Sequence, residues 1–339
     1  MKKLLLICCA VLFVQFAQAQ DIHFSQFYAA PMLTNPANTG NFTGSVRLGL
    51  NYRDQWGSVT VPYKTFSAYA DAGIQPKKAV NRFGIGVTAF ADQVGDGILS
   101  TNKVYLSSAY HIGYTEKSNV RFALGLTGGF VQKTVDITKL TFNSQWNDFE
   151  FDESLSNNEN PTTATLDYAD IGAGAQLTIM PYEGERYIIG ASLMHINEPQ
   201  ESFLGDENKI GIKYTATFGG FFATGGIASF QPQLYVASQY NATEIIAGTN
   251  VSIPINAENN SYNSMFVGAW YRHKDAFWLV GGAQMDKVTV SLSYDLNLSR
   301  LRGASGSLGG FEIAAAYIFG NKVKRTHSNV LLINKLIIA

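Results

Sequence analysis

The feature that most constrains the fold of this chain is an alternation of apolar and polar side chains that recurs in fourteen stretches of roughly ten residues. Between Lys287 and Asn297, Val288, Val290, Leu292, Tyr294 and Leu296 fall on one face, and Thr289, Ser291, Ser293, Asp295 and Asn297 fall on the other. A strand points successive side chains to opposite faces, so one face can meet lipid while the other meets a polar lumen. A soluble sandwich alternates too, but fourteen stretches in an unbroken series favour a transmembrane barrel.

The first nineteen residues have the pattern of a secretory signal peptide. Lys2 and Lys3 precede an apolar core at 4–16, and Ala17-Gln18-Ala19 offers a small-x-small cleavage site. We therefore expect the mature chain to begin at Gln20. Both cysteines of the sequence lie inside the apolar core, so we expect a mature protein with no disulfide and no thiolate nucleophile or metal ligand.

Composition is consistent with a barrel. Charged residues make up only 15% of the chain, aromatic residues 13%, and glycine is abundant with 32 residues. The chain has 25 Lys and Arg against 26 Asp and Glu, so without Lys2 and Lys3 its net charge is −3. This charge balance lacks the excess of positive charge that is typical of nucleic-acid-binding proteins. No later segment is a candidate membrane helix, so strands must do any spanning, with outer-membrane lipid around them.

The alternation predicts an all-β, antiparallel outer-membrane barrel of about fourteen strands. We place the strands near 45–56, 63–75, 81–92, 101–114, 119–133, 164–180, 185–195, 209–219, 227–240, 243–254, 263–273, 276–285, 287–298 and 309–319. An even number puts both ends of the barrel on the periplasmic side, with the long connections outside. The chain then divides into a signal peptide (1–19), an N-terminal periplasmic segment (20–43), the barrel (44–320) and a C-terminal periplasmic tail (321–339).

Charged residues of both signs fall on the polar faces of these strands. The predicted lumen holds Arg47, Arg53, Arg82, Arg121, Glu244, Asp295 and Glu312. Such charges can line a channel or pair across a plugged lumen. We expect no open pore, with the long aromatic-containing loop from Phe142 to Phe151 capping the mouth. We also expect an arginine at Val290 to destabilise the barrel and one at Ser291 to be tolerated.

Residue patterns for catalysis or metal binding are absent from the sequence. The five histidines are scattered and share no ligand spacing. Asp92 and Asp96 faintly suggest a calcium loop, but the bidentate glutamate at the required spacing is missing. No nucleophile with a paired base can be picked out. We expect no enzymatic activity and no cofactor.

The segment before the first strand is aromatic and then rich in turn residues. Phe24, Phe27 and Tyr28 need cover, and Asn35-Pro36 favours a tight turn. We expect this segment to fold into or against the periplasmic mouth of the barrel.

The same segment carries a resemblance to the PorP/SprF family of type IX secretion system membrane proteins, found in Bacteroidota. The matching positions are Phe24-Ser25-Gln26-Phe27-Tyr28, Pro31, Asn35-Pro36-Ala37, Gly40, Tyr52-Arg53-Asp54-Gln55-Trp56, residues 63–67, Asp92 with Gly95-Asp96-Gly97, Tyr271-Arg272 with Asp275-Ala276, Ser293-Tyr294-Asp295, Ser299, and Phe311-Glu312-Ile313 with Tyr317. The resemblance makes Phe24, Gln26, Asn35, Pro36, Tyr52, Arg53, Gln55, Trp56 and Asp295 the candidates for family-specific partner binding.

The resemblance implies a function in secretion or gliding motility. Such a barrel would bind or anchor a secreted adhesin or other surface protein through its C-terminal sorting domain, and link it to periplasmic machinery. The alternative is a small-molecule channel or hydrophobic-substrate transporter. The tail beyond Gly320 combines a basic stretch with an apolar one. It is expected either to pack on the barrel mouth or to dock a periplasmic component.

Overall fold

The computed structural model describes residues 24–57, 61–95, 99–115, 118–136, 143–147, 149–152, 154–155, 165–203, 207–224, 228–256, 263–299 and 302–320. The predicted signal peptide (1–19) and the predicted tail (321–339) lie outside these ranges, so both stay predictions.

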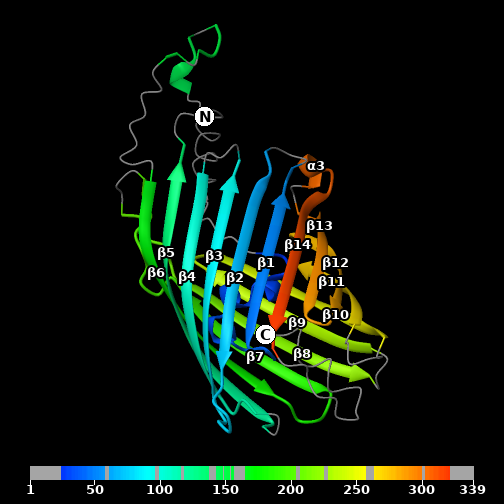
Figure 1. Cartoon of the computed structure of the whole chain (residues 1–339). Coiled ribbons are helices and arrows are strands. Elements are labelled where there is room, and N and C mark those ends of the chain that lie inside the picture. The colour runs from blue at the N-terminus through cyan, green and yellow to red at the C-terminus, as the bar shows by residue number, and fades with distance from the viewer. Residues whose placement is uncertain are drawn as a thin grey trace, which may run out of the picture.

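Fourteen strands lie within the described residues, and they close into one antiparallel barrel (Figure 1). Consecutive strands pair, and β1 closes the ring against β14, with Val46 opposite Phe319. The strands are β1 (Val46–Gln55), β2 (Tyr63–Ile74), β3 (Arg82–Val94), β4 (Leu99–Ile112), β5 (Val120–Val135), β6 (Thr165–Ile179), β7 (Glu185–Met194), β8 (Lys213–Thr224), β9 (Ala228–Gln239), β10 (Ala242–Asn256), β11 (Asn263–Arg272), β12 (Ala276–Met285), β13 (Val288–Asn297) and β14 (Leu308–Phe319). The predicted fold class and strand number are confirmed.

The two ends of the barrel differ. The terminal end is the one where β1 begins and β14 finishes, and the opposite, loop end carries the connection between β5 and β6 (Figure 1). A short helix, α3 (Arg302–Ser305), also lies at the loop end before β14. Which compartment each end faces stays a prediction. No helix among the described residues is both long and apolar enough to cross a membrane.

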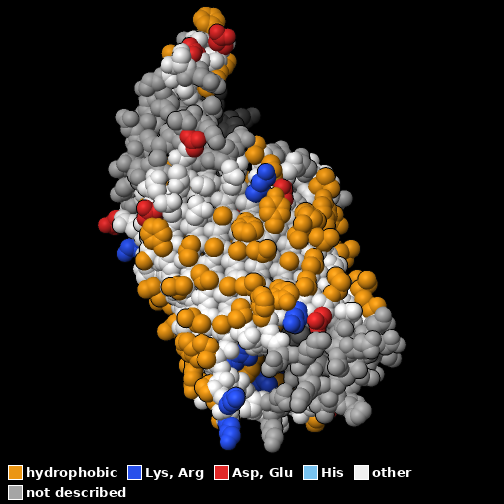
Figure 2. Space-filling view, viewed as in Figure 1, with side chains coloured by type: hydrophobic (Ala, Val, Ile, Leu, Met, Phe, Trp, Pro, Cys, Tyr) orange, Lys and Arg blue, Asp and Glu red, His pale blue; other side chains and the backbone are white. Residues whose placement is uncertain are grey.

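The alternation of the sequence becomes two chemically distinct faces. Leu126 and Val267 are each 63% exposed on the outer face, and Figure 2 shows hydrophobic side chains in rows across the middle of the barrel. The polar positions between them point inward and are largely buried; examples are Arg47, Ser293 and Asp295. An outer apolar band around a polar interior is the pattern of a barrel that meets lipid.

One strand departs from its predicted position. The eighth strand, predicted at 209–219 with a turn after it, runs from Lys213 to Thr224. The Gly219-Gly220 pair reads as a turn in the sequence, but here the chain passes through it in extended conformation. The ring of Phe222 packs over Gly220 and occupies the space that a side chain would need. Glycine in a strand often marks this kind of close approach.

An arginine at Val290 should cost roughly 2–4 kcal/mol of folding free energy, because it places a charge near the lipid-facing midplane. Val290 is exposed on the outer face as the third residue of β13. The measurement is urea-dependent folding into liposomes, with Val290→Ile as the control of similar size and no charge. Equal folding free energies for the two variants would show that this face does not meet lipid.

Candidate functional site

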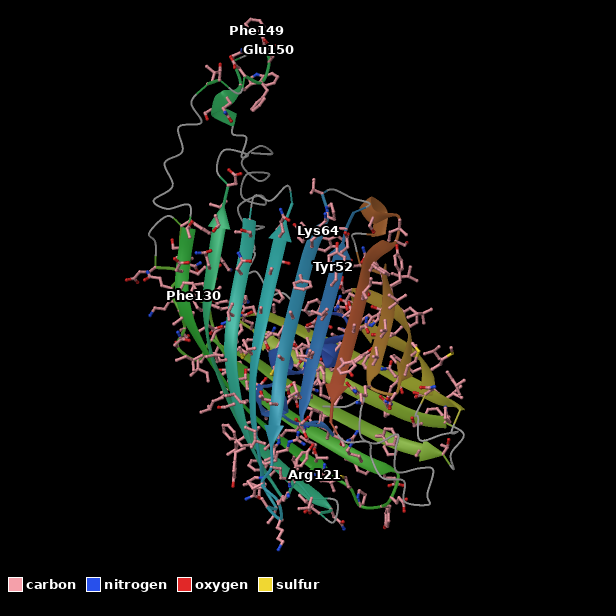
Figure 3. All side chains as sticks on the ribbon, in the orientation of Figure 1. Tyr52, Lys64, Arg121, Phe130, Phe149 and Glu150 are labelled. Atoms are coloured by element: carbon pink, nitrogen blue, oxygen red, sulfur yellow. The ribbon has the colours of Figure 1, made fainter. Side chains whose placement is uncertain are left out.

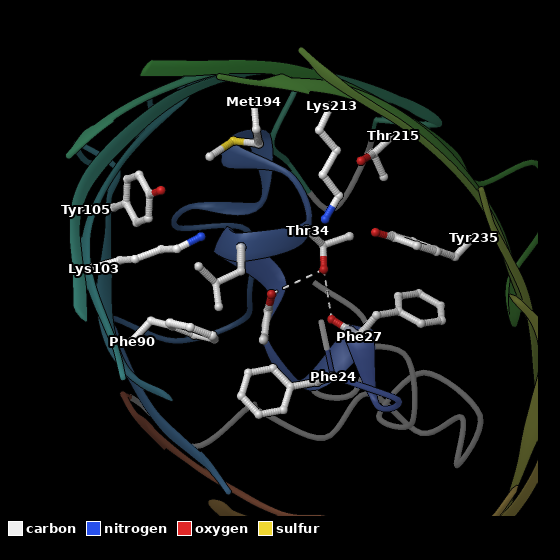
Figure 4. Close-up of a pocket in the computed structure, with 12 residues that line it drawn as sticks. Phe24, Phe27, Thr34, Phe90, Lys103, Tyr105, Met194, Lys213, Thr215 and Tyr235 are labelled. Carbon is white, nitrogen blue, oxygen red and sulfur yellow. Dashed lines mark hydrogen bonds between the residues drawn. The ribbon is translucent and has the colours of Figure 1, made fainter. Parts of the chain in front are cut away.

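Residues 24–42, here called the plug, lie inside the barrel rather than across its mouth (Figure 4). The plug contains three short helical turns, η1 (Phe27–Ala29), α2 (Pro31–Thr34) and η2 (Pro36–Asn38). It runs from contacts near the loop end of β13 and β14 to contacts near the start of β3 at the terminal end. Of the two predicted arrangements, the described residues of this segment fold into the barrel and do not lie against its mouth.

The turns of the plug follow from its Asn-Pro sequence. The Asn35 side chain accepts a hydrogen bond from the Ala37 amide at 2.9 Å and caps η2, which begins at Pro36. The Asn35 amide group also donates to the carbonyl oxygens of Ala175 and Ala191, at 3.0 and 3.2 Å. One side chain thus shapes the turn and ties it to β6 and β7.

A buried cluster of charges holds the first residues of the plug. Arg53 on β1 pairs with Asp295 at 3.3 Å and with Glu312 at 3.1 Å. Glu312 accepts hydrogen bonds from the backbone amides of Ser25 (2.5 Å) and Gln26 (2.9 Å). The Ser25 hydroxyl donates to Asp295 at 2.6 Å. The plug therefore supplies donors to two carboxylates that are almost wholly buried.

A second arginine extends this cluster on the neighbouring strands. Arg272 at the end of β11 pairs with Glu244 at 2.8 Å and with Asp275 at 3.0 Å. It also donates to the Ser25 hydroxyl at 3.1 Å. Ser25 therefore bridges the network of Arg53 and the network of Arg272.

The Gln26 side chain fixes the register of the plug against β13. Its amide nitrogen donates to Ser293 at 3.1 Å, and its amide oxygen accepts from Ser291 at 2.6 Å. Ser291 is therefore packed against the plug rather than facing open water. The expectation that an arginine is tolerated at Ser291 stays a prediction, and this contact counts against it because an arginine side chain would displace Gln26.

The far end of the plug is anchored at the terminal end. Arg47 forms a two-bond pair with Asp71, at 3.0 and 2.8 Å, and Asp71 also accepts from the Gly40 amide at 2.7 Å. Arg82 donates to the carbonyl oxygens of Phe42 (2.7 Å) and Gly44 (2.8 Å). The guanidinium groups of Arg47 and Arg82 lie over the Phe42 ring at 4.8 and 5.2 Å.

Glycines on the inner wall make room for the plug backbone. A side chain at Gly84 would clash with the Thr39 carbonyl, one at Gly125 with Pro36 and Ala37, and one at Gly174 with Asn35. On the opposite wall, Phe27 packs against Trp270 and Tyr235, with ring centres 5.6 and 4.9 Å apart. Burial raises the pKa of the neighbouring Tyr28 phenol far above its usual range, so that ring stays neutral. The wall is thus shaped to this plug on both sides.

Most of the candidate residues meet at the plug. Phe24, Gln26, Asn35 and Pro36 are part of it. The wall residues that bind it directly are Arg47, Arg82, Asp295 and Glu312, whereas Arg53 reaches it through Asp295 and Glu312, and Glu244 reaches it through Arg272.

Four candidates lie elsewhere. Tyr52 is on the outer face near the loop end, with its hydroxyl 3.3 Å from Asp54 (Figure 3). Gln55 ends β1, and Trp56 packs against Tyr63 at 4.9 Å. Arg121 lies at the terminal end, where it donates to a backbone carbonyl oxygen of the turn between β4 and β5 (Figure 3).

Sequence reasoning missed several residues of this site. Asp71, His111 and Trp270 all contact the plug, His111 through a 2.8 Å hydrogen bond with the Thr39 carbonyl. The alternation alone places Asp71 on the same face as Thr65 and Ser67 of its strand, so counting inward polar positions could have found it. No local signal pairs these wall residues with the plug.

A small cavity remains between the plug and the wall (Figure 4). Its volume is about 50 Å³. Its apolar lining includes Phe24, Leu33, Phe90 and Met194, and Lys103 and Lys213 also border it. A dry cavity that binds benzene has about 150 Å³, so this space admits water but no aromatic molecule without movement of the plug.

The described part of the long β5–β6 connection does not cap the mouth. It includes η4 (Asn143–Gln145) and a single bridge between Trp146 and Phe151, and it stands away from the barrel (Figures 1 and 3). Phe149 is 90% exposed at its tip. The expectation of a capping loop is therefore wrong for these residues, and the plug fills the lumen instead.

Within the described ranges, no group of three or more His, Cys, Asp or Glu side chains is arranged to hold a metal ion. The buried carboxylates Asp295 and Glu312 are instead matched to a guanidinium group and to donors of the plug.

Comparisons with known proteins give a family and a fold. A protein-family model described as "Type IX secretion system membrane protein PorP/SprF" matches residues 16–317. The fold is similar to that of the toluene transporter TbuX of Ralstonia pickettii, with a TM-score of 0.54, 11% identity, and coverage of 88% of this chain and 96% of that chain. The toluene transporter TodX of Pseudomonas putida gives a TM-score of 0.50, 12% identity, and coverage of 88% and 94%. A comparison with curated proteins gave no match. At these identities the structural likeness shows the fold alone.

Proposed function

Because this chain belongs to the PorP/SprF family of type IX secretion system membrane proteins, we propose that its barrel binds or anchors a secreted cell-surface protein, such as an adhesin, through that protein's C-terminal sorting domain. The barrel, an outer-membrane β-barrel by fold and family, would also link that partner to periplasmic components of the secretion or gliding motility machinery. The proposal includes no catalytic activity and no cofactor.

The observation that carries the proposal is the exposure of apolar side chains outside the membrane-facing band. Trp146 is 53% exposed and Phe149 is 90% exposed on the segment that stands away from the loop end. Neighbouring apolar side chains that are exposed to water often mark protein-binding sites. Aromatic rings contribute much of the binding energy at such sites. A plugged lumen supports the same conclusion, because it leaves the outer loops as the surface available to a large partner.

Photo-crosslinking in intact cells tests this proposal. A photoreactive amino acid at Phe149 should capture a secreted protein that carries a C-terminal sorting domain. The same amino acid at Tyr182, which is exposed in the turn at the terminal end, should capture periplasmic components instead. Mass spectrometry identifies the products. Capture of periplasmic proteins from Phe149, or of the surface protein from Tyr182, would contradict the proposed arrangement.

The variant Trp146→Ala/Phe149→Ala should lower surface display of the captured protein by about tenfold or more, since two exposed aromatic anchors are lost. Val80→Ala is the control, because it removes an exposed apolar side chain from the turn between β2 and β3 at the opposite end. Surface display is measured by labelling of intact cells, with barrel abundance in the outer membrane measured in parallel. Unchanged display in the double variant would remove this segment from the binding site.

A hydrophobic-substrate channel is the second candidate, favoured by the apolar lining of the lumenal cavity. The two transporters of similar fold are described as toluene transporters. The volume of the cavity, about 50 Å³, counts against this function unless the plug moves. Faster entry of toluene into liposomes that contain the protein than into empty liposomes would favour it.

A further inference from the structure

Four odd-numbered strands place an arginine at their first or second residue. These are Arg47 on β1, Arg82 on β3, Arg121 on β5 and Arg186 on β7. The residue after each arginine is apolar or aromatic and belongs to the outer face. The alternation of a strand therefore turns all four guanidinium groups toward the lumen at the terminal end.

Among the described residues, only one of these four arginines pairs with a carboxylate. Arg47 is bound to Asp71, whose two oxygens accept from this arginine and from the Gly40 amide. Arg82 donates to two backbone carbonyl oxygens, and Arg121 donates to the Thr115 carbonyl at 3.0 Å. A carbonyl oxygen satisfies a donor but leaves the positive charge uncompensated.

Within the part of the chain that the structure describes, Arg186 has fewer hydrogen-bond acceptors for its guanidinium group than the other three arginines have. Its Nε and Nη2 atoms, like the Nε atom of Arg121, are buried with no hydrogen-bond acceptor among the described residues. Glu183 and Glu185 lie beside it in sequence, but neither forms an ion pair with Arg186 or Arg121 in the described part of the chain. A buried N–H group of a charged side chain costs free energy when it has no acceptor. We therefore expect an acceptor to bind at this position.

Aromatic rings hold the guanidinium groups in place. Arg82 and Arg121 both lie over the Tyr114 ring, at 4.8 and 4.6 Å, and Arg186 lies over Phe221 at 5.8 Å. A ring contacts the flat face of a guanidinium and leaves its N–H edge available for an anion. The stacking also keeps like charges close together without a counter-charge.

We propose that Arg121 and Arg186, with Arg82 on the same Tyr114 ring as Arg121, form a binding site for a phosphate group at the terminal end of the lumen. Phosphate fits better than a single carboxylate, since it carries up to two negative charges near neutral pH and accepts paired N–H groups from several arginines at once. Free phosphate that enters through the mouth and a lipid headgroup both offer phosphate oxygens to paired N–H groups, and a headgroup phosphodiester carries a single negative charge. The predicted orientation would place the site on the periplasmic side.

The test is titration of the purified full chain with inorganic phosphate at low salt, followed by isothermal calorimetry. Arg121→Gln and Arg186→Gln should each weaken binding by about tenfold or more, because each removes charge-assisted hydrogen bonds. Arg186→Lys, which keeps the charge but not the fork of donors, should fall between them and the unmodified protein. Lys77→Gln is the matched control, since it removes one positive charge from the turn at the same mouth.

A second measurement needs no substitution. Inorganic phosphate should protect Arg121 and Arg186 from phenylglyoxal, an arginine-modifying reagent, while modification elsewhere continues. Nanodiscs with phosphatidylglycerol in place of phosphatidylcholine provide the lipid arm: protection by the anionic lipid alone assigns the site to a headgroup phosphate. Absence of protection by either source overturns the proposal. So does equal phosphate binding by the glutamine variants, or binding of an oligoglutamate peptide where phosphate has no effect.

Discussion

Deleting residues 24–42, while keeping the signal sequence, should turn a silent barrel into a conducting pore. Eight strands enclose a space that side chains fill, whereas 16–18 strands leave an aqueous channel. A barrel of fourteen strands is closer to the second case, so its own inward side chains do not close it. We therefore expect conductance in planar bilayers to rise by about an order of magnitude or more when the plug is removed.

The control is deletion of residues 143–155, whose described part stands away from the mouth. That variant should stay as silent as the unmodified protein, because the loop does not fill the lumen. Large, stable, ohmic steps from the unmodified protein would instead favour the channel function. A silent protein after deletion of the plug would mean that another part of the chain seals the barrel.

Replacing Arg53 with Met should cost about 3–5 kcal/mol of folding free energy, because it leaves two buried carboxylates without their counter-charge. Asp295 and Glu312 are each 2% exposed, so neither can regain water without movement of the plug. Folding free energy is measured by urea titration in detergent micelles. Asp286→Asn, a change of charge in an exposed turn, is the control and should fall within about 0.5 kcal/mol of the unmodified protein.

A double variant separates the pair from its surroundings. Arg53→Met/Glu312→Met removes one charge of each sign and should recover part of the loss, as expected for two residues in one network. Limited proteolysis provides an independent check, since a loosened plug exposes the backbone near Ser25. If the single variant is as stable as the control, the buried pair does not hold the plug.

The wall of the barrel is predictable from the sequence because the wall obeys a local rule. Period-two alternation decides which side chain meets lipid, and by itself it places Arg47, Arg82 and Glu312 on the inner face, where they lie. The misplaced eighth strand shows the limit of such rules. A Gly-Gly pair reads as a turn by itself, whereas here it pairs with Ile188 and Tyr187 of β7 and Phe222 packs over it.

The plug lies beyond sequence reasoning for a different reason. Its aromatic and Asn-Pro residues indicate that it needs cover and that it turns, but not which wall receives it. Ser25 and its acceptor Glu312 are 287 residues apart, and no period links them. The loop with Phe149 is long and aromatic, which favours a cap over the mouth. Neither property gives the direction in which a loop leaves a barrel.

The position of the plug also constrains the order in which this protein can assemble. The plug immediately precedes β1, the strand that must pair with β14 to close the ring. It contacts β3, β5 and β6 on one side and β11, β13 and β14 on the other, so it bridges halves of the chain that are made far apart in time. A ring that closed empty would have to thread the plug back through its mouth. We therefore expect the ring of the intact protein to close around a plug that is already in place.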